Sequence, residues 1–420
     1  MEFHHVRALL HAAPLILLAI PGSAAMEEKD FAAMKAELDA TKHELATTRT
    51  TLERVERRLD QLEASRAAPA QAPSGPRIAP VNADNPAISF VVDTTLQTDT
   101  HGSGWDFALR SGELFISAPI DPFLRGFATL NGSTEDGFDI EEAAVVTTAL
   151  PWNLTVEGGR FFADVGRLPH WHDEALPFVD RPPSIDRLIG GESQSEGAQI
   201  TWLAPTEHYI RVTGGLFNTI GAEYNEQLRD EGFDGYRDFS QLTFLVHPET
   251  YFDLTDTLNL ELGTSFVTVP KHDQRYLYGI DATLRHQPGT SEFYQGLVIG
   301  SEWFWNEQKF DDVEVGTDPG TGDPIFADQH AHRNGGYAYL EAFLGRRYSV
   351  GIRGDYAEDA FGPANRQRTY SAFATWMPSE FQRLRFQFDQ IDAAGEPDNQ
   401  RFTLQWTAFL GSHSHGFANR

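Results

Sequence analysis

One short segment of the 420-residue chain gathers side chains that can bind a metal ion. Four candidates fall within five consecutive positions: His170, His172, Asp173 and Glu174. Imidazole and carboxylate groups are ligands of Zn²⁺ and Cu²⁺, so this cluster predicts a site for zinc or another divalent cation. The alternative is a set of polar loop histidines that contact solvent or lipid headgroups.

Two further His-X-His pairs share this chemistry: His330 with His332, and His413 with His415. Alternate residues of an extended chain lie on one side, so each pair presents both imidazoles together. Catalysis finds less support. The chain has no cysteine and neither a GxSxG nor an HExxH motif, and no spacing brings Ser195, His208 and Asp180 together. We therefore expect no enzymatic activity and no resident cofactor.

The elements that must position these residues are β-strands, because the apolar period from residue 87 onward is two. Leu258, Leu260 and Leu262, for example, alternate with Asn259 and Glu261. Such alternation is typical of strands with one face on apolar material and the other on water. Sixteen strands are predicted, near 87–97, 105–118, 123–131, 138–149, 152–163, 196–204, 207–218, 237–250, 257–269, 275–286, 292–307, 335–345, 347–358, 366–377, 380–392 and 399–410.

The lengths of the connections separate a membrane barrel from a soluble β protein. Connections after even-numbered strands are short, whereas the long segments 164–195, 219–236 and 308–334 all follow odd-numbered strands. Short periplasmic turns and long outer loops are typical of outer-membrane barrels, which also have even strand numbers. The predicted fold class is therefore all-β: a 16-stranded antiparallel transmembrane β-barrel with an N-terminal periplasmic α-helical coiled coil.

The chain before the barrel divides into three segments. Residues 1–25 resemble a secretory signal peptide, with a basic residue, a short apolar stretch and small residues before the expected cleavage site; an anchor helix is the alternative. Heptad spacing within 26–66 predicts a coiled coil, although a single amphipathic helix gives the same pattern. A Pro/Ala-rich linker at 67–86 leads into the barrel at 87–420.

The acidic charge of the chain is concentrated in the barrel. The whole chain has a net charge of −28, and residues 87–420 hold 23 basic and 49 acidic residues. This balance argues against nucleic-acid binding and favours cation entry into a pore; acidic loops that stabilise lipopolysaccharide contacts are the alternative. The predicted pore-lining residues are Glu261, Asp281, Asp355 and Asp389, opposite Arg353, Arg383 and Arg385. The proline-stiffened segment 164–195 is expected to fold into the lumen and set the constriction.

Several stretches of the body resemble a family of Gram-negative outer-membrane porin-like β-barrels. The matching stretches are GRFFADVGRLPHWHDEALPFVDRPP (159–183), YGIDATLRHQP (278–288), YSVGIRGDYAE (348–358), MPSEFQRLRFQF (377–388) and LQWTAFLGSHSH (404–415). They are similar to phosphate-selective porins of the O and P type and to relatives labelled zinc-regulated outer-membrane receptors. The resemblance implies an oligomeric β-barrel pore. The body departs from a phosphate channel in having only two lysines, Lys271 and Lys309.

Together these patterns predict an outer-membrane porin of a Gram-negative bacterium, for diffusion of small hydrophilic solutes with modest cation preference. We expect a homotrimer in contact with outer-membrane lipid and lipopolysaccharide. The coiled coil would lie in the periplasm, where it can contact peptidoglycan. The alternatives are a zinc or copper uptake channel or receptor, and a structural tether anchored through the coiled coil.

Overall fold

The computed structural model describes residues 35, 42, 86–134, 137–224, 238–271, 274–287, 296–317, 322, 324–358 and 366–411. Contacts divide the chain into two units, 1–78 and 79–420. The signal peptide and nearly all of the coiled coil and linker lie outside the described residues, so they stay predictions. Lys35 and Lys42, within the heptad segment, are helical and exposed. Among the described residues, no helix combines the length and apolar character needed to cross a membrane.

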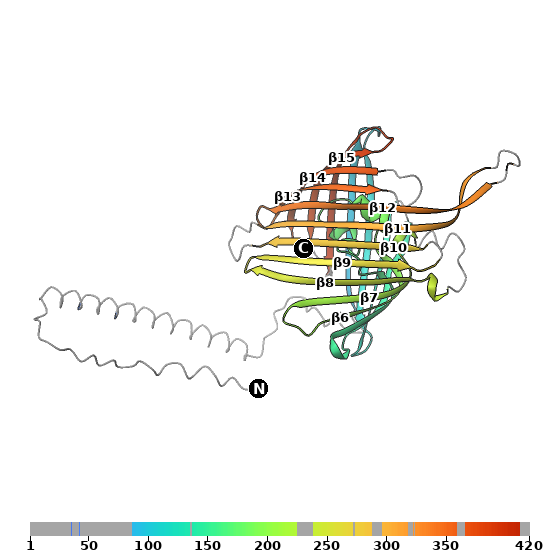
Figure 1. Ribbon diagram of the computed structural model, residues 1–420. Coiled ribbons are helices and arrows are strands. Elements are labelled where there is room, and N and C mark those ends of the chain that lie inside the picture. Colours follow the sequence, from blue (N-terminus) through green and yellow to red (C-terminus); the bar gives the residue numbers. More distant parts are fainter. Residues whose placement is uncertain are drawn as a thin grey trace, which may run out of the picture. The chain divides into compact units, whose positions relative to one another are not determined.

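The second unit is a closed antiparallel barrel of sixteen strands (Figure 1). Each strand pairs with its sequence neighbours, and β1 closes the ring against β16. The strands are β1 (Ala87–Asp99), β2 (Asp106–Pro119), β3 (Leu124–Ser133), β4 (Gly137–Thr147), β5 (Leu154–Phe162), β6 (Gln194–Leu203), β7 (Tyr209–Ile220), β8 (Thr243–Thr255), β9 (Leu258–Val269), β10 (Arg275–His286), β11 (Leu297–Thr317), β12 (Pro324–Phe343), β13 (Tyr348–Glu358), β14 (Arg366–Ser379), β15 (Gln382–Ala393) and β16 (Asn399–Gly411).

Apart from one apolar core cluster, the strands turn polar side chains to the interior and apolar side chains to the exterior. In β16, Gln405 and Thr407 are 0% exposed, whereas Leu404 and Trp406 between and beside them are 42% and 43% exposed. Because side chains alternate across a strand, this pattern places the polar residues on the interior face and the apolar ones on the exterior. An exterior of exposed Phe, Leu, Ile and Trp side chains suits lipid, and ring closure leaves no unpaired strand edge.

The predicted strand set is confirmed, with shifted boundaries in β8, β11 and β12. β8 begins at Thr243 rather than near 237, because Asp238 and Gln241 form a capping box around the short η3 helix (Phe239–Gln241). β11 and β12 extend well beyond the predicted ends, so most of the expected loop 308–334 is a hairpin instead. Pairing continues there from Lys309 opposite His330 to Thr317 opposite Pro324, and the Lys309 ammonium contacts Asp328 at 2.8 Å.

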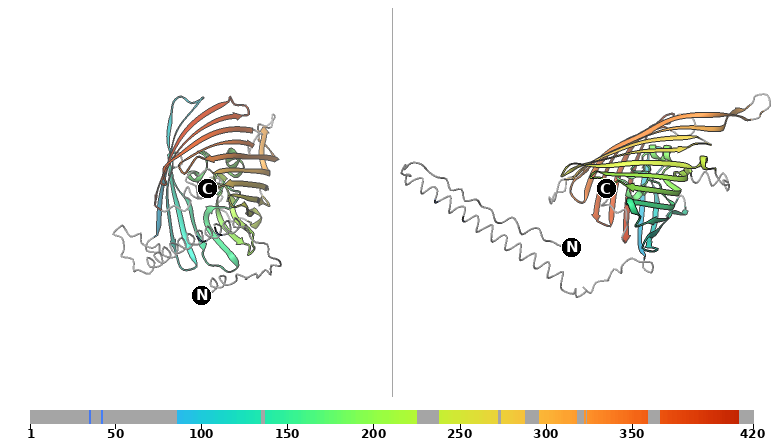
Figure 2. Two further views of the ribbon diagram at one scale, coloured as in Figure 1. Left: turned by 90° about the vertical axis from the view of Figure 1, so that its left-hand side faces the viewer. Right: turned by 60° about the horizontal axis from the view of Figure 1, so that its bottom comes forward.

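The long connection between β5 and β6, residues 163–193, folds into the barrel (Figure 2). It contains the η2 turn (Asp173–Ala175) and the α2 helix (Pro183–Ile189). Its apolar side chains are buried against inward-facing residues of the wall: Phe178 makes edge contacts with Tyr337, Tyr339 and Phe373 at ring-centre distances of 5.5–6.2 Å. We call residues 163–193 the inner loop.

Candidate functional site

Two water-accessible cavities remain inside the barrel, one on each side of the inner loop. The larger has a volume of about 490 Å³ and faces the short turns. The inner loop contributes Arg167, His170 and Trp171 to its wall. Strands β7–β10 supply the rest: Tyr209, Arg211, His247, Glu249, Tyr251, Asn259, Glu261, Asp281, Arg285 and Gln287 line it from the ends near the short turns. We call it the turn-side cavity.

Charges in the turn-side cavity are nearly balanced and mutually paired. Glu261 on β9 pairs with Arg167 of the inner loop and, at 2.8 Å, with Arg285 on β10. Arg211 on β7 contacts Glu249 at 2.6 Å and Asp164 at 3.1 Å. Because these opposite charges pair between neighbouring strands or with the inner loop, little net charge of either sign remains on this part of the wall.

The smaller cavity has a volume of about 190 Å³ and reaches the β3–β4 connection at Ser133 and Gly137. We call it the loop-side cavity. Its lining is mainly acidic: Glu113, Asp139, Glu141, Asp173 and Glu192 face one basic residue, Arg110. The inner loop therefore separates a charge-balanced cavity from an acidic one.

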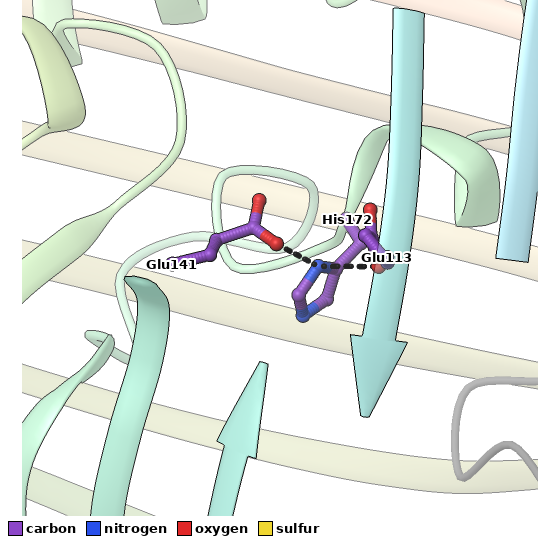
Figure 3. Close-up of side chains that lie close together, drawn as sticks. All are labelled: Glu113, Glu141 and His172. Carbon is purple, nitrogen blue, oxygen red and sulfur yellow. Dashed lines mark ion pairs between the residues drawn. The ribbon is translucent and has the colours of Figure 1, made fainter. Parts of the chain in front are cut away.

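His172 lies at the wall of the loop-side cavity among glutamates (Figure 3). Its Nδ1 atom is 3.4 Å from a carboxylate oxygen of Glu113 and 3.4 Å from one of Glu141. Its Nε2 atom is 3.1 Å from Glu142 Oε2. Burial alone lowers the pKa of His172, but the carboxylates of Glu141 and Glu113 outweigh burial and raise that pKa well above its usual value.

A β-bulge explains how two consecutive glutamates reach the interior. Thr129 opposes Glu142 and Leu130 opposes Ile140, so Glu141 is the extra residue of β4. Glu141 and Glu142 are 6% and 7% exposed. In regular pairing one of them would point to lipid, and the bulge turns both inward.

The four residues of the predicted metal cluster do not converge. His170 lines the turn-side cavity, where burial lowers its pKa to about 4. His172 faces the β2 and β4 glutamates. Asp173 accepts a hydrogen bond from Arg181 at 2.7 Å, and the buried Glu174 accepts one from Arg383 through its backbone carbonyl. The structure instead groups His172 with Glu113 and Glu141.

All seven predicted pore-lining residues lie on the interior face of the barrel, in two environments. Glu261 and Asp281 line the turn-side cavity. The others are buried in the wall that the inner loop covers: Arg353, Asp355, Arg383, Arg385 and Asp389. Their contact with solute therefore stays a prediction.

Asp180 of the inner loop is the centre of the buried network on that wall. Its carboxylate contacts Arg353 at 3.3 Å and pairs with Arg401, which also contacts Asp389. The guanidinium of Arg353 lies 4.2 Å from the ring centre of Phe178. These contacts fix the inner loop against β13 and β16.

The remaining histidine pairs lie elsewhere. His330 and His332 are exposed on β12, and His332 lies 3.8 Å from Glu307. His413 and His415 lie outside the described residues. Sequence reasoning missed Glu113, Glu141 and Glu142; the one signal that could have found them is the Glu141–Glu142 pair itself, which breaks the period-two pattern of its strand.

Comparison with known proteins supports the fold. A comparison with models of protein families gave no match. A protein of Aquifex aeolicus, described only as uncharacterized, is 29% identical over 350 residues, which are 74% of this chain and 70% of that protein.

Two solved structures share the architecture at low sequence identity. The anion-selective porin from Comamonas acidovorans has a TM-score of 0.51 at 10% identity, over 77% of this chain and 99% of its own. OprB of Pseudomonas putida has a TM-score of 0.50 at 9% identity, over 77% and 94%. The implied resemblance is thus confirmed at the level of the fold: the chain has the closed sixteen-stranded barrel of the outer-membrane porins.

Proposed function

We propose that this protein is an outer-membrane channel for passive diffusion of small hydrophilic solutes. The observation that carries the proposal is a barrel with an apolar exterior whose interior, beside the apolar core around the inner loop, holds many charged side chains and two water-accessible cavities. A soluble protein would bury its apolar side chains and expose the charged ones. Sixteen strands also give a ring wide enough for water-filled space between wall and inner loop.

A modest preference for cations follows from the loop-side cavity. Five acidic residues and one arginine line it. Arg160 and Arg181 contact three of these acids, so the negative potential that raises the local concentration of cations comes mainly from Glu113 and Glu141. The turn-side cavity, with balanced charges, adds little discrimination by sign. The inner loop, between the two, is the proposed constriction.

The orientation and assembly belong to the same proposal. Long connections would face the outside and the short turns the periplasm, where the coiled coil of 26–66 would help hold three copies together. Deleting residues 26–66 should then loosen the oligomer, which size-exclusion chromatography with light scattering measures. An unchanged oligomer mass would defeat this role.

The positions of Ser195, His208 and Asp180 support a transport function without catalysis. Ser195 donates to the Ser193 carbonyl at 2.9 Å, Asp180 is bound to Arg353 and Arg401, and His208 lies in the β6–β7 turn. These three residues lie on separate elements.

Single-channel recording in planar bilayers tests the proposal. The refolded full chain should produce stepwise conductance, and a salt gradient should give a reversal potential biased toward cations. Silence under all conditions would contradict the channel, and an anion-biased reversal potential would contradict the charge argument alone.

A further inference from the structure

Three ligand-type atoms converge in the wall of the loop-side cavity. They come from Glu113 on β2, Glu141 on β4 and His172 of the inner loop, and all lie within 4.8 Å of one another. The three residues are buried, at 2%, 6% and 3% exposure. Three segments distant in sequence therefore deliver two carboxylates and one imidazole to a single point (Figure 3).

The distances from the imidazole to the two carboxylates match those between neighbouring ligands of a metal ion. His172 Nδ1 lies 3.4 Å from each of the two carboxylate oxygens. In a tetrahedral zinc site with bonds of about 2.0–2.2 Å, neighbouring ligand atoms lie about 3.3–3.6 Å apart. The same distance is long for a hydrogen bond to a charged carboxylate, which is usually about 2.7–2.9 Å.

One oxygen of each carboxylate faces this point without a close hydrogen-bond donor among the described residues. Glu113 Oε1 accepts a hydrogen bond from Ser111 at 2.9 Å, which leaves Oε2 facing His172. Glu113 Oε2 and Glu141 Oε2 are both buried, and neither accepts a hydrogen bond from the described residues. Buried carboxylate oxygens without donors are costly unless a cation compensates them.

The other nitrogen of His172 has the partner that a metal ligand needs. Nε2 contacts Glu142 Oε2 at 3.1 Å, and Thr129 donates to the same oxygen at 3.0 Å. A histidine that binds a metal through one nitrogen almost always donates its other N–H to a carboxylate or carbonyl. Glu142 would thus fix the tautomer whose Nδ1 lone pair points to the ion.

We propose that Glu113, Glu141 and His172 form a buried Zn²⁺ site. The loop-side cavity of about 190 Å³, which Glu113 and Glu141 line, gives the ion an entry path and leaves room for water as fourth ligand. Two carboxylates neutralise the divalent charge. The bound ion connects the inner loop to β2 and β4 and so holds the proposed constriction against the barrel wall.

Calorimetric titration of the refolded full chain with ZnCl₂ tests the site, with Glu113→Gln/Glu141→Gln as the main variant. The isosteric variant keeps shape and removes both ligand charges, so the wild type should bind one more zinc ion than the variant. His170→Ala is the matched control: it deletes the neighbouring imidazole, which faces the other cavity, and should keep the site. Glu142→Gln should keep the stoichiometry and bind about 10–100-fold more weakly.

A second readout guards against misfolding. Circular dichroism must show that each variant is folded. If the double variant does not fold, Glu113→Gln alone takes its place. Zinc should raise the unfolding temperature of the wild type and of His170→Ala, with reversal by EDTA, and leave the double variant unchanged. Equal zinc stoichiometry and affinity in wild type and double variant would overturn the site, leaving His172 as a protonated partner of the glutamates. An absence of conductance in bilayers would contradict the channel function but would leave the zinc-binding result unaffected.

Discussion

The two cavities beside the inner loop differ in how their charges are satisfied. In the turn-side cavity Glu261 contacts Arg167 and Arg285, and Glu249 contacts Arg211 on the neighbouring strand. In the loop-side cavity acidic residues outnumber the basic ones, and Glu113 and Glu141 meet only His172 at ion-pair distance. A single inserted loop has divided one barrel interior into two electrostatic environments.

The difference shows that the strands alone do not set the character of this interior. The wall supplies charges of both signs, and the inner loop decides which become paired. Asp180 is held by Arg353 and Arg401, whereas Arg181 contacts Asp173 and Glu192 at the edge of the loop-side cavity. The placement of the inner loop is therefore the feature to perturb first.

Asp180→Ala should have the largest effect, because it removes the anchor of the inner loop. Arg353, whose side chain is fully buried, then loses a carboxylate partner. Breaking a buried pair in this way costs about 3 kcal/mol of unfolding free energy. Denaturant unfolding followed by tryptophan fluorescence measures the loss, and channel conductance should rise as the loop loosens.

The control for this variant is Glu380→Gln, at the exposed β14–β15 turn, which should leave both quantities unchanged. If Asp180→Ala unfolds like the wild type, the Asp180 network does not hold the inner loop.

Neutralising the loop-side cavity should reduce the difference between the two environments. Asp139→Asn/Glu192→Gln removes two of its five acidic residues, so the permeability ratio of cations to anions should fall roughly twofold. Reversal potentials in a salt gradient measure this ratio. Glu396→Gln/Asp398→Asn removes the same charge from the exposed β15–β16 connection and should change the ratio less. Equal changes in both double variants would assign selectivity to overall charge.

Arg211→Gln changes the charge of the turn-side cavity instead of the loop-side cavity. It leaves Glu249 and Asp164 in the turn-side cavity without this guanidinium, so that cavity becomes acidic as well. Cation preference should increase by less than the previous variant decreases it, because Arg167 and Arg285 remain nearby. The same reversal-potential measurement applies, and a shift toward anions would contradict the proposed role of these charges.

A pH dependence of stability is expected through Asp186 in α2. Burial, partly offset by Arg181 and reinforced by Asp173, Asp180 and Glu223, raises its pKa from 3.8 to about 8. The folded protein therefore holds this proton more tightly than the unfolded chain. The contribution of this bound proton to the stability of the folded protein is fully present below pH 3.8 and is lost as the pH rises to about 8.

Asp186→Asn removes this dependence. As the pH rises from 3.8 to about 8, the free energy of unfolding of the variant should increase relative to that of the wild type. Denaturant titrations at both pH values measure this difference. A constant difference would mean that Asp186 titrates normally in the folded state.

The sequence by itself determined the wall of the barrel. Period-two alternation fixes which residues of a strand share a face, so Glu261 and Arg383 could be placed inside without coordinates. The parity of connection lengths indicated a membrane barrel and predicted three long connections, of which 164–195 corresponds to the inner loop. These features are local: each depends on the order of residues along one strand or between two.

Tertiary structure alone decided what the inner loop contacts. Neighbouring residues of an irregular loop have no fixed period, so nothing in the spacing of His170 and His172 shows that they face different cavities. The bulge that turns Glu141 inward depends on how β4 pairs with β3. A cluster built from β2, β4 and a loop requires distant segments to meet, and that meeting is a property of the closed barrel.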